Sequence, residues 1–344
     1  MKAGSASVVR TALIGFGRVA ELHYVPALRA LPNVRIVAVA DPLVARQEAA
    51  REAFGDATIF PRADILLATE ALDAVLIASP AATHFAIVEA AVQREVAVFV
   101  EKPFVGPGEV ALLKRVSRTD RLMIDFNRRF WPGYQHLRTL VANSRRTDPI
   151  WMRVVMQVDS QRWNSITRIS ERGGEGGVLY DLGSHAIDLA LFISGGEPIS
   201  VRARSTTPTA CSLKVRLRDG STAACFVRYD RRAVERIEVR STVDSYRSIH
   251  PMMSLRAGIH RVRSAAAAAR DCKALAAHLS AGRRSMVRFT IAAALEHFFT
   301  SLPEGISAMP GFAVGLQNAV CLEAALKSIA QRRTVALDEI ATTS

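Results

Sequence analysis

Three short groups of residues in this 344-residue chain combine side chains that could do chemistry together. The first is the loop GFGRVA at residues 15–20, which carries two glycines. The second is Lys102, which stands between Glu101 and a proline. The third is the pair Asp181 and His185, four residues apart. A lysine can stabilise charge that develops on a substrate oxygen, and a histidine near a carboxylate is the usual general base near neutral pH.

The GFGRVA loop stands in the context that dinucleotide binding requires. An apolar run at residues 10–14 predicts a buried strand before it, and a helical pattern follows it. Gly15 would permit the tight turn, and Gly17 would let the backbone approach a pyrophosphate at the helix N-terminus. Asp41, 21 residues beyond Ala20, ends the next predicted strand and would accept hydrogen bonds from a ribose. Since a carboxylate repels a 2′-phosphate, the sequence favours NAD over NADP.

The elements around this loop alternate between strand and helix over the first 125 residues. Helical patterns separate five predicted strands, and Lys102 follows the last of them. Such alternation predicts an α/β domain with a doubly wound parallel sheet, a Rossmann fold, over residues 1–125. The strands are expected at residues 10–14, 34–40, 58–60, 74–78 and 96–100.

The pattern changes after residue 125, where β-rich segments dominate. Arginine alternates with apolar residues at 201–204, which is typical of a sheet with one buried and one polar face. Asp219-Gly220 between two such segments is a hairpin signal. The sequence predicts a second, α+β domain over residues 126–344, with a large open and mainly antiparallel sheet. Its strands are expected at 150–158, 199–205, 211–218, 222–230 and 234–241.

The formal net charge of +13 comes entirely from the second domain. Residues 1–125 carry 14 basic and 14 acidic side chains, whereas residues 126–344 carry 31 and 18. Such an excess indicates either an anionic partner or basic side chains scattered over solvated faces. Direct nucleic-acid binding is not expected, because the arginines are not interleaved with aromatic residues.

Composition excludes several other classes of protein. The four cysteines have neither metal-ligand nor disulfide-framework spacing, so we expect buried thiols and no metal. No signal-like or membrane-spanning apolar run is present, and we expect a cytoplasmic protein. A basic helical stripe over residues 255–284 fits either a membrane or partner surface or, as we favour, packing on its own domain.

Taken together, the motifs resemble those of the glucose–fructose oxidoreductase / inositol dehydrogenase (Gfo/Idh/MocA) family. The resemblance rests on GFGRVAELHYVPAL at residues 15–28, ASP at 78–80 with His84, EKPF at 101–104, NRRFWPGY at 127–134 and GGVLYDLGSHAIDL at 176–189. The pattern departs from the family at Ala81, where asparagine is common.

The resemblance implies an NAD(P)-dependent dehydrogenase that acts on a secondary hydroxyl of a sugar, cyclitol or nucleotide sugar. It assigns the catalytic roles to Lys102, Asp181 and His185, and it implies a homo-oligomer, a dimer or tetramer. The basic second domain tilts the expected substrate toward an anionic one. The residues expected to bind NAD are Gly15, Phe16, Gly17, Arg18, Val19, Asp41, Ser79, Pro80, His84, Glu101 and Lys102.

Two other functions remain open from the sequence. A dinucleotide-sensing regulator could share the fold, although it would not need Lys102, Asp181 and His185 together. An NAD-using glycosidase would oxidise its sugar transiently and would regenerate its cofactor. Net production of NADH distinguishes a dehydrogenase from both.

Overall fold

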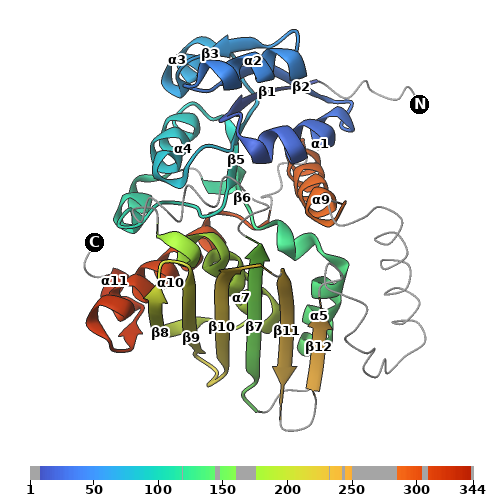
Figure 1. The fold of residues 1–344 in the computed structure, drawn as a ribbon. Helices are drawn as coiled ribbons and strands as arrows, with labels where there is room; N and C mark the ends of the chain where they lie inside the picture. Colours follow the sequence, from blue (N-terminus) through green and yellow to red (C-terminus); the bar gives the residue numbers. More distant parts are fainter. Residues whose placement is uncertain are drawn as a thin grey trace, which may run out of the picture. The chain divides into compact units, whose positions relative to one another are not determined.

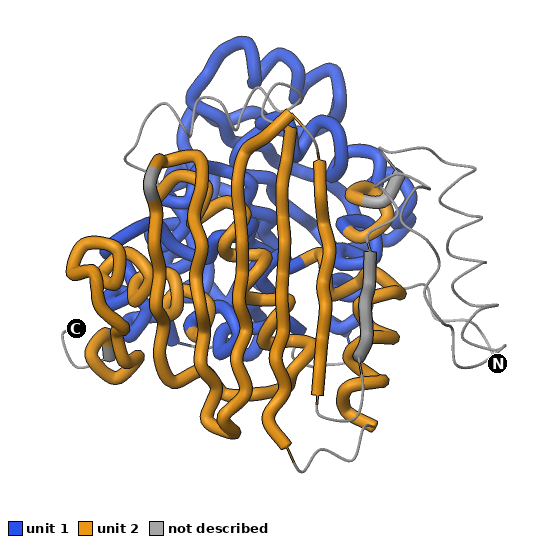
Figure 2. Tube along the Cα trace, turned by 60° about the horizontal axis from the view of Figure 1, so that its bottom comes forward, with its two compact units in different colours: residues 1–126, 291–316 blue, residues 127–290, 317–344 orange. Residues whose placement is uncertain are grey.

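A computed structural model describes residues 8–117, 119–143, 148–159, 176–231, 233–241, 245–249, 285–303 and 309–341. The chain divides into two compact units (Figure 2). The first contains Met1–Phe126 and Ile291–Leu316, and the second contains Asn127–Thr290 and Gln317–Ser344. Residues 291–316, which we expected in the second domain, therefore belong to the first unit.

The first unit is built on a six-stranded sheet in which every pair of neighbouring strands is parallel (Figure 1). The strand order is β3-β2-β1-β4-β5-β6, that of a Rossmann fold, so the predicted fold class is confirmed. A sixth strand, β6, extends the five that the sequence predicts. The strands are β1 (Val9–Ile14), β2 (Val34–Ala40), β3 (Thr58–Phe60), β4 (Ala74–Ile77), β5 (Ala97–Glu101) and β6 (Leu122–Asp125).

Apolar burial explains why these strands lie in the centre of the unit. All four residues of β4 and the first four of β5 are buried, as expected of parallel strands with both faces covered. The Phe298 ring lies 5.5 Å from the Phe99 ring of β5, which shows how the late segment joins this core. Its helices are η1 (Ala20–Tyr24), α1 (Val25–Arg29), α2 (Val44–Ala53), α3 (Ala63–Thr69), η2 (Ala81–Thr83), α4 (His84–Val92), η3 (Val110–Arg115), η4 (Thr119–Arg121), and parts of α9 (Ser285–Ser301) and α10 (Phe312–Gln331).

The second unit contains a seven-stranded sheet in the order β12-β11-β7-β10-β9-β8-β13 (Figures 1 and 2). Only β7 and β10 are parallel among its described strand pairs, and the others are antiparallel. The predicted, mainly antiparallel sheet is thus confirmed. Its strands are β7 (Trp151–Asp159), β8 (Pro198–Thr207), β9 (Ala210–Leu217), β10 (Thr222–Asp230), β11 (Val234–Arg240), β12 (Ser245–Ile249) and β13 (Val335–Ala336).

The alternating pattern of this sheet gives it one apolar and one polar face. Val201 and Ala203 are buried in β8, whereas Arg202 and Arg204 between them are more accessible. The predicted hairpin joins β9 to β10, and Gly220 adopts φ +85° there. Helix α7 packs against β7 and β10. The helices of the unit are η5 (Asn127–Phe130), α5 (Pro132–Asn143), η6 (Leu179–Gly183), α7 (Ser184–Ser194), α11 (Asp338–Ala341), and the rest of α9 and α10.

The cysteines of the described residues behave as buried hydrophobes. Cys211, Cys225 and Cys321 are buried free thiols. Burial raises the pKa of Cys211 to about 11 and that of Cys321 to about 12, so both stay protonated near neutral pH. Cys272 and the predicted basic stripe over 255–284 lie outside the described residues. Within the described part, no helix is long and apolar enough to cross a bilayer.

Candidate active site

The glycine loop follows β1 and turns directly under the end of β4. Gly15 has φ +89°, and a Cβ at this position would lie 2.6 Å from the Ser79 backbone nitrogen. Only glycine therefore fits at residue 15. A Cβ at Gly17 would meet no described atom within 4 Å, so the packing of the protein does not itself require glycine there. Since the fold itself does not need glycine at residue 17, a glycine there is consistent with a ligand that approaches the backbone closely.

Asp41 fastens this loop to the end of β2. Its Oδ2 accepts the Phe16 N–H at 2.8 Å, and its Oδ1 accepts the Leu43 N–H at 2.9 Å. The side chain is only 8 % exposed, so its position is well defined. An ionised carboxylate has about four acceptor sites, and two remain after these bonds. Asp41 can therefore hold the loop and also accept from a ribose hydroxyl.

Arg18 gives a further sign that the loop is shaped for a ligand. Its Nε is buried, and within the described part of the chain no atom accepts its hydrogen. Helical backbone begins at Arg18 and continues into η1, so backbone N–H groups at this helix start point toward the loop. A guanidinium and a helix N-terminus are both suited to a pyrophosphate. The loop residues therefore fit the dinucleotide that the sequence predicts.

His84 ties together the ends of the two strands beside the loop. Its Nε2 lies 2.8 Å from the Ser79 carbonyl oxygen, and its Nδ1 lies 3.0 Å from the Pro103 carbonyl oxygen. Burial lowers the pKa of His84, although the two carbonyls act against this, and the charge of Lys102 lowers it further. The ring is 1 % exposed. His84 is thus placed to hold the segment around Lys102 and not to contact solvent.

Lys102 directly follows Glu101, the last residue of β5, at the carboxyl end of the parallel sheet. Ligands of open α/β sheets bind outside this edge. Ser79 and Pro80 follow β4 at the same edge, and the Ser79 hydroxyl lies 2.7 Å from that of Thr83. The first unit therefore gathers the predicted cofactor residues and Lys102 at one edge of its sheet.

The second unit carries Asp181 and His185 on consecutive helical turns. Asp181 lies in the π-helical turn η6, and His185 is the second residue of α7 and only 6 % exposed. The entry to this helix requires glycine, because Gly177 has φ +56° and a Cβ there would lie 2.8 Å from the Pro208 carbonyl oxygen. The predicted helix and the proximity of the two residues along it are therefore present.

Tyr229 of β10 is a partner of Asp181 that the sequence analysis missed. Its hydroxyl donates to Asp181 Oδ2 at 3.0 Å. Burial raises the pKa of Tyr229, and the Asp181 carboxylate raises it further, so the phenol stays a neutral donor. The alternation of β10 offers a signal, since Tyr229 shares a strand face with the buried Cys225 and Val227.

Neighbouring helices fix the backbone of this turn. The Ser184 hydroxyl donates to the Asp181 carbonyl at 2.9 Å, and Asn318 of α10 donates its amide to the Ser184 carbonyl at 2.9 Å. Tyr180 donates to Glu323, also of α10, at 3.2 Å. These bonds give Asp181 and His185 a rigid support, as a catalytic group requires.

Asp188 has a structural partner within the same unit. Arg129 donates to it in two-pronged geometry, with Nη2 at 2.6 Å from Oδ1 and Nε at 3.0 Å from Oδ2. The Asp188 side chain is 1 % exposed, and the Arg129 guanidinium lies over the Phe192 ring. This pair joins η5 to α7, which explains the arginine in the NRRF segment. In the described residues, no group of three or more His, Cys, Asp or Glu side chains is arranged to hold a metal.

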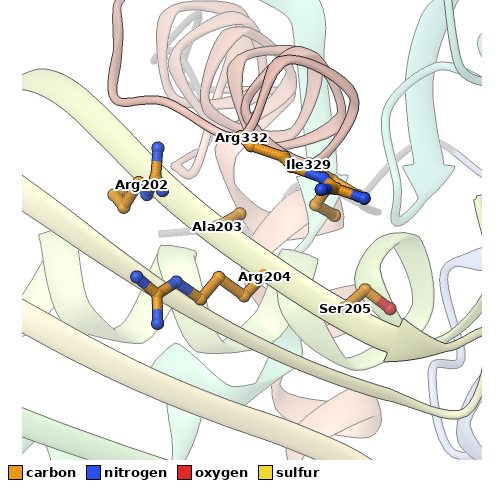
Figure 3. Close-up of a pocket in the computed structure, with 6 residues that line it drawn as sticks. All are labelled: Arg202, Ala203, Arg204, Ser205, Ile329 and Arg332. Carbon is orange, nitrogen blue, oxygen red and sulfur yellow. The ribbon is translucent and has the colours of Figure 1, made fainter.

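A shallow pocket of about 330 Å³ lies elsewhere in the second unit, beside β8 and the end of α10 (Figure 3). Its guanidinium groups do not converge, because those of Arg204 and Arg332 point in opposite directions (Figure 3). The pocket therefore lacks the geometry of an anion site and contains none of the predicted site residues. It is lined by Arg202, Ala203, Arg204, Ser205, Ile329 and Arg332.

Two family models match the chain. Residues 9–121 match the GFO_IDH_MocA oxidoreductase family, NAD-binding Rossmann fold, and residues 134–284 match the GFO/IDH/MocA C-terminal domain. The chain is 28 % identical to inositol 2-dehydrogenase of Rhizobium meliloti, over 96 % of this chain and 99 % of that protein. A UDP-N-acetylglucosamine 3-dehydrogenase of Acidithiobacillus ferrooxidans is 30 % identical over 57 % of each chain.

Comparison with solved structures shows the same fold. The crystal structure of myo-inositol 2-dehydrogenase from Lactobacillus plantarum has a TM-score of 0.78 and 19 % identity, covering 96 % of this chain and 99 % of that one. Scyllo-inositol dehydrogenase from Lactobacillus casei, solved with NAD(H) and scyllo-inositol, has a TM-score of 0.76 and 17 % identity, covering 96 % and 100 %. The chain belongs to the GFO/IDH/MocA family of oxidoreductases, and its first unit carries the family's NAD-binding Rossmann fold.

Proposed function

We propose that this chain is an NAD-dependent dehydrogenase that oxidises a secondary hydroxyl of a cyclitol or sugar, or reduces the corresponding ketone. The observation that carries the proposal is the pair Asp181 and His185 on one rigid helix, in a chain whose other unit binds NAD and bears Lys102. The inositol and sugar-nucleotide dehydrogenases among its relatives support the same substrate class.

Three residues of this chain have distinct roles in the proposed reaction. His185, which is buried, removes the proton of the substrate hydroxyl. Lys102 donates a hydrogen bond to the same oxygen and stabilises its developing charge. Asp181, held by Tyr229, orients His185 or a second substrate hydroxyl. When bound, NAD supplies the acceptor for the hydride that leaves the carbinol carbon.

The cofactor would be held by the first unit. The loop at Gly15 to Val19 would hold the pyrophosphate, and Asp41 would hold the adenosine ribose. Ser79, Pro80 and Glu101 would line the nicotinamide side, with His84 behind them. This assignment depends on loop geometry and on the buried Arg18 Nε.

The direct test is a screen for substrate-dependent NADH formation, with cyclitols, neutral sugars, uronates and nucleotide sugars offered with NAD and with NADP. We expect turnover by one substrate class, and a loss of at least about 100-fold in kcat for Lys102→Ala and for His185→Ala. Full turnover in both variants would refute the assignment. NADH binding without any turnover would indicate a regulator, and glycoside cleavage without net NADH would indicate a glycosidase.

The substrate charge, the assembly and the location are further parts of the proposal. Anionic sugars are included in the screen because the excess charge of +13 resides in the second domain. A preference for neutral cyclitols would reject that part alone. Light scattering tests the expected dimer or tetramer, and cell fractionation tests the expected cytoplasmic location.

A further inference from the structure

A pair of acidic side chains, Glu101 and the buried Asp125, lies in the first unit beside the strand end that precedes Lys102. Asp125 has no part in the mechanism above. Glu101 ends β5 and Asp125 ends β6, and these two residues are paired in the parallel register of neighbouring strands. In-register residues of adjacent strands project from the same face of a sheet, so the two carboxyl groups are neighbours. Asp125 is 1 % exposed.

Tyr24 of η1 reaches both carboxyl groups. Its hydroxyl lies 2.9 Å from Glu101 Oε1 and 3.5 Å from Asp125 Oδ2. The Tyr24 ring is fully buried and meets the Phe99 ring edge-on at 6.0 Å, which fixes its position. Glu101 also forms a side-chain hydrogen bond with Asp125. Two ionised carboxyl groups can only accept, so a hydrogen bond between them needs a proton on one of the two.

Burial and the charge of Lys102 act on Glu101 in opposite directions. Burial raises the pKa of Glu101, and Lys102 is the main group that acts in the opposite direction. Burial also raises the pKa of Tyr24, and both carboxyl groups raise it further, so the phenol does not ionise. The helix α9 contributes the apolar Phe298 to this side of the core, against Phe99. Two adjacent buried carboxylates cannot both ionise at low cost.

We infer that Glu101 and Asp125 share one proton, under the hydroxyl of Tyr24, and that Asp125 is a positioning residue that acts through Glu101 on Lys102. With the proton in place, the pair carries one negative charge and Glu101 is held against Asp125. When the proton is lost, the pair carries two negative charges, one of them on Glu101, which interacts with the Lys102 ammonium group. The role of Lys102 as the residue acted on rests on the proposed function, whereas the shared proton does not.

Infrared spectroscopy of the full-length protein tests the shared proton without any substrate. At about pH 6, where ordinary carboxyl groups are ionised, we expect a neutral-carboxyl band in the wild type that is lost in both Asp125→Asn and Glu101→Gln. Asp64→Asn, which removes an exposed carboxylate paired with Arg62, should leave the band unchanged.

The alternative outcomes are decisive. No such band in the wild type, or a band retained in either Asp125→Asn or Glu101→Gln, would overturn the inference, because a shared proton needs both carboxyl groups. If Asp125→Asn or Glu101→Gln fails to fold, Tyr24→Phe provides a second test, since this variant keeps both carboxyl groups. It should keep the band at a shifted frequency, and loss of the band there would also count against a shared proton.

The effect on Lys102 is measured separately, by NMR of reductively ¹³C-methylated protein. The chain has six lysines, so Lys102→Arg assigns the signal. Asp125→Asn removes one carboxyl group of the pair, and we expect the Lys102 signal to move from its wild-type chemical shift. Asp64→Asn should not move it. An unchanged signal in Asp125→Asn would remove the link to Lys102. A moved signal without turnover of any sugar would instead refute the proposed function alone.

Discussion

The Tyr229 hydroxyl donates a 3.0 Å hydrogen bond to the Asp181 carboxylate, and this bond joins the second strand of a hairpin to the helix that carries His185. It fixes the position of the Asp181 Oδ2 atom. The raised pKa of Tyr229 means that the phenol remains a donor throughout the working range of pH. The arrangement makes Tyr229 a supporting residue for the proposed catalytic pair.

Replacing this tyrosine should therefore lower turnover more than stability. Tyr229→Phe removes a hydrogen bond to a charged acceptor, which corresponds to about 1.5–3 kcal/mol, or roughly a 10- to 150-fold loss in kcat. Tyr180→Phe is the matched control. Tyr180 lies on the same turn as Asp181, and its hydroxyl bonds Glu323 of α10 instead of Asp181. Steady-state kinetics should show a much larger loss for Tyr229→Phe, and equal losses would assign the bond a merely structural role.

The two loop glycines should respond differently to alanine. Gly15→Ala places a Cβ 2.6 Å from the Ser79 nitrogen at φ +89°, so the melting temperature should fall. Gly17→Ala meets no described atom, so it should keep the wild-type melting temperature and lose affinity for NADH. Calorimetry and NADH fluorescence titration separate the two effects. Wild-type NADH affinity in Gly17→Ala would argue against pyrophosphate binding by this loop.

Asp41→Asn tests cofactor choice. The substitution keeps one acceptor oxygen near Phe16 and removes the charge that repels a 2′-phosphate. We expect the NADH dissociation constant to rise about 10-fold, while that for NADPH falls or stays unchanged. Asp56→Asn, at an exposed carboxylate paired with Arg35, should leave both constants unchanged. A variant that prefers NADH as strongly as the wild type does would show that Asp41 does not select the cofactor.

The sequence predicts the local parts of this architecture well, because local chemistry determines them. The glycine loop, the apolar strand at residues 74–77 and the Asp219-Gly220 hairpin each carry their own signal, and each is present. The membership of residues 291–316 in the first unit was not predicted, since it depends on Phe298 meeting Phe99 far away in the sequence.

The partners of the site residues were harder to foresee for the same reason. Alternation shows which face of β10 carries Tyr229, but the helix residue that it meets depends on how the helix packs on the sheet. Asp125 lies in β6, a strand that the sequence analysis did not predict, and only the register of β6 with β5 brings it to Glu101. The roles of Lys102, Asp181 and His185 stay predictions that the kinetic experiments test.

His84 makes stability depend on pH in a defined direction. Burial lowers its pKa below the ordinary value of 6.5, so the folded protein binds a proton less readily than the unfolded chain. Its contribution is fully present above about pH 6.5 and is lost as the pH falls toward the lower, folded-state pKa. The free energy of unfolding should therefore decrease between pH 7 and pH 5. In His84→Gln this decrease should be smaller, and an identical slope in urea denaturation would contradict the prediction.

The buried ion pair between Arg129 and Asp188 should be far more sensitive than an exposed one. Arg129→Met leaves the Asp188 carboxyl group, 1 % exposed, without its two-pronged donor. Breaking a buried pair in this way costs about 3–5 kcal/mol of the free energy of unfolding. Protonation of Asp188 offsets part of this loss, because burial already raises the pKa of Asp188.

Arg218→Met, which breaks the exposed pair with Glu197, serves as the control and should have no measurable effect. Chemical denaturation of both variants at pH 8 and pH 6 measures this, and the deficit of Arg129→Met should be smaller at pH 6. A deficit that is equal at the two values would show that Asp188 remains ionised without its arginine.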